Sequence, residues 1–129
     1  MNQIIGIGVD IVKTQRINIS IKNQRFINRI FSKNEISISK RFSNKTNFFS
    51  KRFAAKEAFA KALGTGFRHN LNFKDIQILN DNIGKPYYLI NSRIRRLIQK
   101  QKKIKKFNLF LSISDEKDYS IAFTIIQKI

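Results

Sequence analysis

A single long helical pattern, at about residues 47–63, constrains the fold of this chain more than any other segment. Apolar side chains recur in it at helical spacing, among them Phe49, Phe53 and Leu63. Four alanines in the same stretch would let a second element pack closely against the helix: Ala54, Ala55, Ala58 and Ala62. The segment 64–66 follows, with glycines that tolerate the positive φ common at helix ends. We therefore expect a closely packed helix that stops at this loop.

Strand-like runs lie on both sides of this helix in the sequence. The run at 3–9 is apolar, is interrupted by Gly6 and Gly8, and ends at Asp10. Further runs at 76–79 and 87–90 flank a turn-rich segment, and runs at about 108–114 and 119–127 read as an antiparallel hairpin. Helical patterns cover about 14–31 and 92–104, and a capping box at 32–35 begins a short helix. Because the strands lack βαβ regularity, we predict an α+β fold with a mostly antiparallel sheet packed against helices.

Length and composition indicate one globular domain over residues 1–129. Hydrophobic residues make up 42% of the chain and 12 of them are Phe, which is enough for a packed core. The chain has no cysteine, which excludes disulfides and thiolate metal sites. The N-terminal run does not resemble a signal peptide, and no uncharged segment is long enough to cross a bilayer. We expect a cytoplasmic protein without a membrane partner.

The charge balance predicts a polyanionic partner. Lys and Arg number 26 against 8 Asp and Glu, a net charge of +18. Nucleic acid, an acidic protein and a phosphorylated ligand are all compatible with such a charge.

Two carboxylates stand out in this basic background. Asp10 closes the first strand, and Glu57 lies within the long helix among Lys and Arg. Oxygen ligands of this kind suit Mg²⁺ held against substrate phosphates. The alternative is that Asp10 and Glu57 each form an ordinary ion pair, and for Glu57 the partner would be Lys61 at i, i+4 on the same helix face. Arg52 and Lys56, also at i, i+4, place two basic side chains on an adjoining face.

Three motifs resemble those of holo-acyl-carrier-protein synthases, the short form of 4′-phosphopantetheinyl transferase. They are GIGVDIV at 6–12, RFAAKEAFAKALGTG at 52–66 and GKP at 84–86. Their order and spacing match the family, the second motif is highly specific, and the resemblance spans nearly the whole chain. It favours the metal-site interpretation of Asp10 and Glu57 over the ion pairs.

The resemblance implies a reaction of fatty acid biosynthesis. The phosphopantetheine arm of coenzyme A passes to a serine of apo-acyl carrier protein, and adenosine 3′,5′-bisphosphate is released. By matching position, Asp10 and Glu57 would bind Mg²⁺, and Lys61 would act with them on the phosphates. For the base that deprotonates the serine, the choice lies between a metal-organised water and one of the carboxylates, of which Glu57 is favoured.

The resemblance also assigns binding residues. Further phosphate or subunit contacts would come from Arg52 and Lys56. Two loops would let the protein backbone approach the cofactor, with Lys85 near its phosphates. The residues assigned in these loops are Gly64, Gly66, Gly84, Lys85 and Pro86. The acidic carrier protein would meet a basic helix face formed by Arg16, Lys22, Arg25 and Arg29, for which the alternative is an ordinary solvated face. Members of the family commonly form homotrimers with active sites between subunits.

Two positions depart from the family pattern. Phe110 and Asp115 stand where many members carry histidines, and any proton or contact role of the first of these histidines is left open here. We expect Phe110 to fill the core, with packing near the nucleotide as the alternative. Ser112 and Ser114 read as strand residues, and His69, the chain's one histidine, as structural or solvent-facing.

Two other classes of function compete with the transferase. A nucleic-acid-binding module would use the net charge and the basic helix at 92–104, and a noncatalytic partner of an acidic protein would need only basic helices. The chain shows no helix-turn-helix spacing, zinc pattern or ribonucleoprotein motif, and neither class explains Asp10 and Glu57. We therefore expect no nucleic-acid partner.

Overall fold

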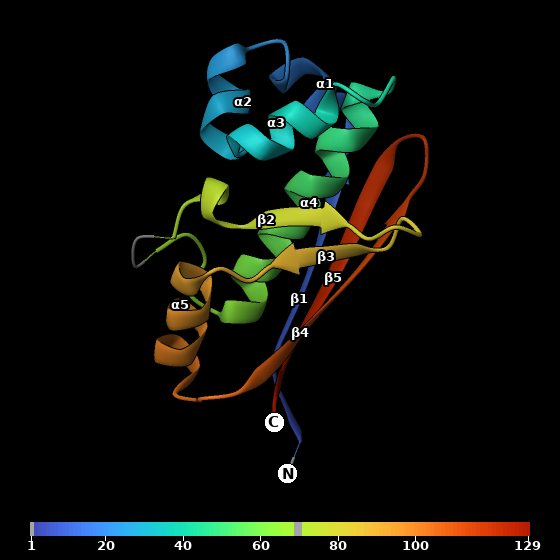
Figure 1. Ribbon diagram of the computed structural model, residues 1–129. Helices are drawn as coiled ribbons and strands as arrows, with labels where there is room; N and C mark the ends of the chain where they lie inside the picture. The colour runs from blue at the N-terminus through green and yellow to red at the C-terminus, as the bar shows by residue number, and fades with distance from the viewer. Residues whose placement is uncertain (1, 69–70) are drawn as a thin grey trace.

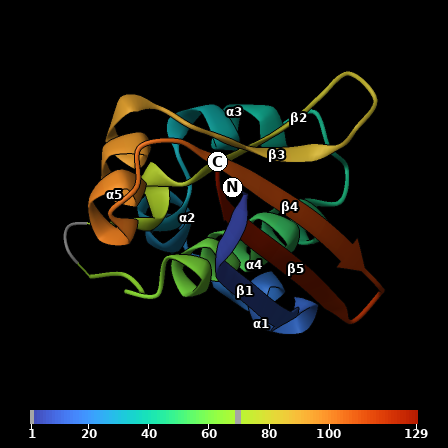
Figure 2. The same ribbon diagram turned by 90° about the horizontal axis from the view of Figure 1, so that it is seen from below.

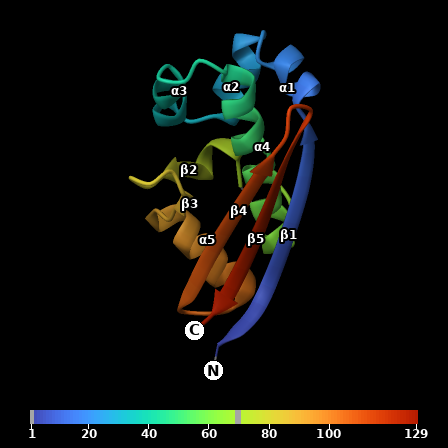
Figure 3. The same ribbon diagram turned by 90° about the vertical axis from the view of Figure 1, so that its right-hand side faces the viewer.

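The computed structural model describes residues 2–68 and 71–129, so His69 lies outside the described residues. Two antiparallel sheets form its framework (Figure 1). The larger has the strand order β1-β5-β4, with β1 at Gln3–Lys13, β4 at Phe107–Asp115 and β5 at Tyr119–Lys128. The smaller pairs β2 (Gln77–Asn80) with β3 (Pro86–Leu89). Figure 3 shows the three long strands side by side as one twisted sheet.

Five α-helices and one 3₁₀ turn are found in the described residues. The helices are α1 (Thr14–Ser20), α2 (Gln24–Ile30), α3 (Lys33–Ser39), α4 (Lys45–Leu63) and α5 (Ser92–Lys102), and the turn is η1 (Phe73–Asp75). Helices α1–α3 gather at one end of α4, whereas α5 lies far from the β4–β5 turn (Figures 1 and 2). None of the described helices is long and apolar enough to cross a membrane.

Helix α4 is the centre of the core, because most of its side chains are buried. It packs against the inner face of the larger sheet, and two glycines of β1 make this contact possible. A Cβ atom added to Gly6 would collide with the carbonyl oxygen of Ala62, and one added to Gly8 with that of Ala58. Small residues on both elements therefore bring strand and helix backbones together and place the end of β1 against α4.

The α+β class and the antiparallel sheet are confirmed, and several local predictions hold. Ser32 and Glu35 form the capping box that begins α3, and α4 ends at Gly64 with a left-handed φ of 87°. The predicted helix at 14–31 is two helices, because Asn23 caps a new start by accepting a hydrogen bond from the Arg25 backbone N–H. Strand β1 continues three residues past Asp10, to Lys13, in register with β5.

The outer face of the larger sheet is apolar and exposed. Cross-strand rows there join Ile7, Ile125 and Phe110, and then Val9 and Phe123. Val9 is 52% exposed and Phe110 49%. The prediction that Phe110 fills the core of this chain is therefore wrong: its strand position points it away from α4.

Candidate active site

Strand β1 and helix α4 bring three of the predicted site residues together. Asp10 faces the helix because Gly8, two residues earlier on the same side of the strand, packs directly on α4. Lys61 Nζ donates to Asp10 Oδ1 at 3.1 Å and to the Val9 carbonyl oxygen at 3.0 Å. The salt bridges of the described residues include this cross-element pair but no i, i+4 bridge between Glu57 and Lys61. The lysine side chain is 55% exposed, so its charge remains open to a ligand.

Glu57 completes this cluster on the adjacent turn of α4. Partial burial raises its pKa above the ordinary value of 4.5, and the nearby carboxylate of Asp10 raises it further. Lys61 and Arg16 act in the opposite direction. The Asp10 carboxylate disfavours the ionised form of Glu57, and a cation bound between the two would relieve this repulsion.

The donor chemistry of this pair fits Mg²⁺. The described residues contain no group of three or more Asp, Glu, His or Cys side chains that could hold a metal ion. A cation at Asp10 and Glu57 would thus take its other ligands from water and substrate phosphates. This is how Mg²⁺ commonly binds, with one or two protein carboxylates.

Lys56 has a different environment from the one predicted. Its side chain is fully buried and its ammonium lies 2.7 Å from Glu35 Oε1. It also donates to the carbonyl oxygens of Phe73 and Ile76. The expected phosphate or subunit contact of Lys56 is therefore corrected to a buried structural ion pair.

Arg52 lies on the same side of α4 as Lys56 but borders a hollow of about 140 Å³. Gly84 from the β2–β3 turn and Pro86 at the start of β3 line the same hollow, together with Asp115 at the end of β4. Arg52 Nη2 donates to Asn80 Oδ1 at 2.8 Å, and its guanidinium lies 3.8 Å from the centre of the Phe48 ring. It forms no salt bridge with any described carboxylate.

Burial lowers the pKa of Arg52 to about 10, and the carboxylate of Glu35 offsets part of this shift. A guanidinium buried in this way would be stabilised by an anion in the hollow. The other nominated loop residues are placed apart from it. Gly64 and Gly66 follow the far end of α4, beyond Lys61, and Lys85 is exposed, with its backbone N–H bonded to Asp81 Oδ1.

The four basic residues proposed for a carrier protein are all exposed. A surface hollow of about 560 Å³ between α1 and α2 is lined by Ile19, Phe26, Arg25 and Arg29, among others. No acidic residue occurs between Asp10 and Glu35 in the sequence. The hollow thus combines two apolar side chains with two cations, and no carboxylate is among the residues that line it.

Comparisons with known proteins identify the family. The model of the 4′-phosphopantetheinyl transferase superfamily matches residues 6–124. A holo-[acyl-carrier-protein] synthase of Pelagibacter ubique is 58% identical over 126 residues, which cover 98% of both chains. The chain belongs to the 4′-phosphopantetheinyl transferase superfamily.

Solved structures of this superfamily share the fold. The holo-[acyl-carrier-protein] synthase of Neisseria meningitidis superposes with a TM-score of 0.85 at 39% identity, covering 96% of this chain and 98% of the other. The enzyme from Bacillus anthracis, solved in complex with CoA (3′,5′-ADP), gives 0.80 at 34% identity, with 98% of both chains covered. The predicted family and the α+β fold are thus confirmed, and so is the prediction that the chain is an enzyme of the phosphopantetheinyl transferase class.

Around the Arg52 hollow and the neighbouring pocket, sequence reasoning missed Lys51, Asn80 and Asn47, and it noted Asp115 only as a departure from the family pattern. Lys51 and Asn80 line the hollow, and Asp115 lines it as well as the adjoining pocket that contains Asn47. Lys51 directly precedes Arg52 in the sequence, which was a signal for it. Nothing local links Asn80 to Arg52, because Asn80 lies on β2, whereas Asn47 lies five residues before Arg52 on α4 itself.

Proposed function

We propose that this chain transfers the 4′-phosphopantetheine group of coenzyme A to a serine of apo-acyl carrier protein, with Mg²⁺, and releases adenosine 3′,5′-bisphosphate. The observation that carries the proposal is the meeting of Asp10, Glu57 and Lys61 at the β1–α4 contact. Superfamily membership gives the reaction type, and these side chains supply the charges that phosphoryl chemistry requires.

Each residue has a role that follows from its position. Asp10 and Glu57 would hold the cation, which when bound would orient the pyrophosphate and stabilise charge on its oxygens. Lys61, exposed beside Asp10, would neutralise a phosphate oxygen directly. Glu57 is the side-chain candidate for accepting the serine proton, because in the metal-free chain its raised pKa makes it a stronger base than an ordinary glutamate.

The coenzyme would use both sides of α4. Glu57 and Arg52 are five residues apart, which separates them by about 140° around the helix axis. The cation site and the Arg52 hollow of one chain therefore face different directions. A coenzyme that touches both sites would therefore bridge two chains. The cation site would come from one chain and the Arg52 hollow from its neighbour.

The exposed sheet face supports an assembly of this kind, and we propose a homotrimer. Ile7, Val9, Phe110 and Phe123 form a contiguous apolar area, which in soluble proteins marks an interaction surface. Sedimentation velocity should show trimers for the wild type and smaller species for Phe123→Glu. Ile83→Lys, at an 85% exposed position in the β2–β3 turn, is the control and should leave the trimer intact. A monomeric wild type would contradict the assembly.

The transfer reaction can be tested by intact mass spectrometry. Apo-acyl carrier protein incubated with this chain, coenzyme A and Mg²⁺ should gain one phosphopantetheine, and EDTA should abolish the gain. Asp10→Asn and Glu57→Gln should each slow the gain by roughly 10²-fold or more, as expected for loss of a group that stabilises transition-state charge. Asp118→Asn, an exposed carboxylate in the β4–β5 turn, is the control.

A folded wild type that leaves a competent carrier protein unmodified would contradict the function. Transfer that survives in the Asp10→Asn, Glu57→Gln double variant would contradict the site.

The same assay tests the carrier surface: Arg25→Glu should raise the KM for carrier protein by about tenfold in a salt-dependent way, with Arg96→Glu on α5 as the matched control.

A further inference from the structure

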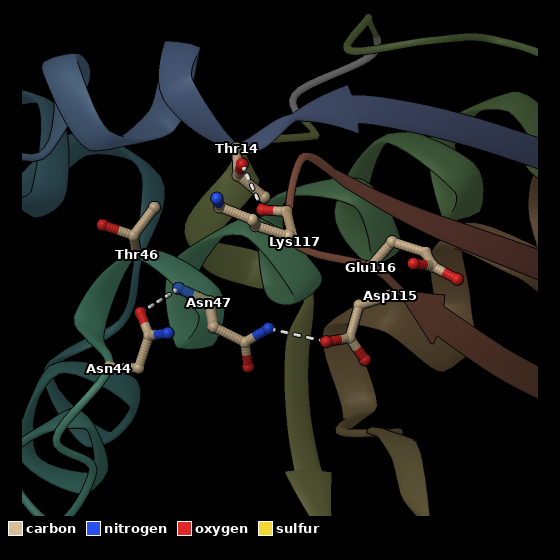
Figure 4. A pocket seen from close by; sticks show the side chains of 7 residues that line it. All are labelled: Thr14, Asn44, Thr46, Asn47, Asp115, Glu116 and Lys117. Carbon is tan, nitrogen blue, oxygen red and sulfur yellow. Dashed lines mark hydrogen bonds between the residues drawn. The ribbon is translucent and has the colours of Figure 1, made fainter.

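Asp115 occupies an unusual position, at a junction between two surface hollows. One is the Arg52 hollow, and the other has a volume of about 370 Å³ and is lined by Thr14, Asn47 and Glu116, among others. Figure 4 shows Asn47 pointing at Asp115 across the second hollow. The Asn47 amide Nδ2 donates to Asp115 Oδ2 at 2.7 Å, which fixes the orientation of the carboxylate.

The charges around the Arg52 hollow are mixed. Lys51 and Arg52 provide two cations, and Arg52 is only 4% exposed. Asp115 is the one carboxylate among the residues that line it. Its second oxygen, Oδ1, receives no hydrogen bond from the described part of the chain, whereas Asn47 occupies Oδ2. The hollow therefore offers cations for a phosphate and a free acceptor for a hydroxyl group.

Coenzyme A carries two kinds of phosphate, a pyrophosphate and a 3′-phosphate on its ribose. The pyrophosphate belongs with the cation site in the proposed function, which leaves the Arg52 hollow for the phosphorylated ribose. A carboxylate in such a pocket repels the phosphate. It also accepts hydrogen bonds from ribose hydroxyls, while arginine favours a ribose phosphate.

We infer that Asp115 is a specificity residue that weakens the preference of this hollow for a 3′-phosphorylated ribose and so narrows the gap in affinity between coenzyme A and 3′-dephospho-coenzyme A. The inference rests on the proposed function. The role of Asp115 can nevertheless be tested separately from that function, because a transferase with any residue at position 115 could still use coenzyme A.

Isothermal titration calorimetry with the full chain and Mg²⁺ tests the inference. The two ligands are coenzyme A and 3′-dephospho-coenzyme A, which differ only in the 3′-phosphate. Asp115→Asn removes the charge and keeps the shape and a hydrogen-bond acceptor. We expect it to bind coenzyme A about tenfold more tightly, with a change of less than about twofold for the dephospho form, since only one ligand places a phosphate near the lost charge.

A matched control comes from the neighbouring residue. Glu116→Gln removes the same unit of charge, but Glu116 lines only the larger hollow. It should leave the ratio of the two affinities within about twofold of the wild type, because exposed charges outside the hollow are screened. Arg52→Met should move the ratio in the opposite direction, by weakening coenzyme A more than the dephospho form. Urea unfolding curves confirm that each variant is folded.

The outcomes separate the inference from the proposed function. If both ligands bind the wild type and Asp115→Asn leaves their ratio unchanged, the role of Asp115 is overturned and the function stands. An equal shift in Asp115→Asn and Glu116→Gln overturns it too, because the effect would then be one of net charge. If neither ligand binds the folded wild type, the inference and the proposed function fail together.

Discussion

Helix α4 carries two lysine–carboxylate pairs that have similar chemistry and contrasting surroundings. Lys56 and Glu35 lie 2.7 Å apart with both side chains fully buried. Lys61 and Asp10 lie 3.1 Å apart, with 55% and 15% of their side chains exposed. The lysines are only five residues apart on one helix, so the difference arises from what covers each side of it.

The buried pair has all its charge satisfied within the protein. Lys56 donates to two backbone carbonyl oxygens besides Glu35, and Glu35 accepts from the backbone N–H groups of Ser32 and Ile78. The exposed pair is incomplete, because Lys61 is open to solvent and Asp10 lies close enough to Glu57 to raise its pKa. Burial therefore decides which lysine ties elements together and which is available to a ligand.

The largest expected effect follows from breaking the buried pair. Glu35→Gln should lower the free energy of unfolding by about 3–5 kcal/mol, because Lys56 would keep a buried charge without its counter-charge. Lys61→Met should change it by less than about 1 kcal/mol, as for an exposed pair. Urea denaturation measures both. Equal losses in the two variants would contradict the contrast between the buried and the exposed pair.

A smaller effect is expected at the contact that creates the exposed pair. Gly8→Ala should cost about 1–3 kcal/mol, because its methyl group collides with the Ala58 carbonyl oxygen and the strand must move from the helix. Transfer activity should fall as well, since Asp10 moves with the strand. Asn108→Ala, at an exposed position in the same sheet, should stay within about 0.5 kcal/mol of the wild type. An unchanged Gly8→Ala protein would show that the close approach is dispensable.

The smallest effect is a pH dependence at the exposed pair. The pKa of Glu57 is raised in the folded state, so the folded protein binds more protons than the unfolded chain between the two values. The stability that Glu57 contributes without metal is thus full below its unfolded pKa and is lost as the pH rises through its folded pKa. Saturating Mg²⁺ should oppose this loss, because it favours the ionised form.

The measurement is the difference in unfolding free energy between wild type and Glu57→Gln, in EDTA, at a series of pH values. The difference should decline as the pH rises above 4.5, the ordinary value for this side chain. A difference that is flat or that increases with pH would contradict the raised pKa of Glu57.

Local sequence determined the elements and the chemical types of the site. The periodicity of 47–63 predicted α4, the Ser32 capping box predicted the start of α3, and the strand-like runs at 108–114 and 119–127 predicted the β4–β5 hairpin. Asp10 and Glu57 were nominated from the sequence as the carboxylates of the proposed site, and the fold brings both to the β1–α4 contact. These features depend on neighbouring residues and on helix or strand periodicity, both of which can be read along the chain.

Only the tertiary structure decided which charges are available. Lys56 and Lys61 look alike in sequence, and β2, η1 and α3 bury one of them while β1 leaves the other exposed. The exposed position of Phe110 and the meeting of Asp115 with Arg52 are also invisible locally. The physical reason is that burial and long-range pairing depend on which faces of distant elements pack together, and that choice minimises the free energy of the whole chain.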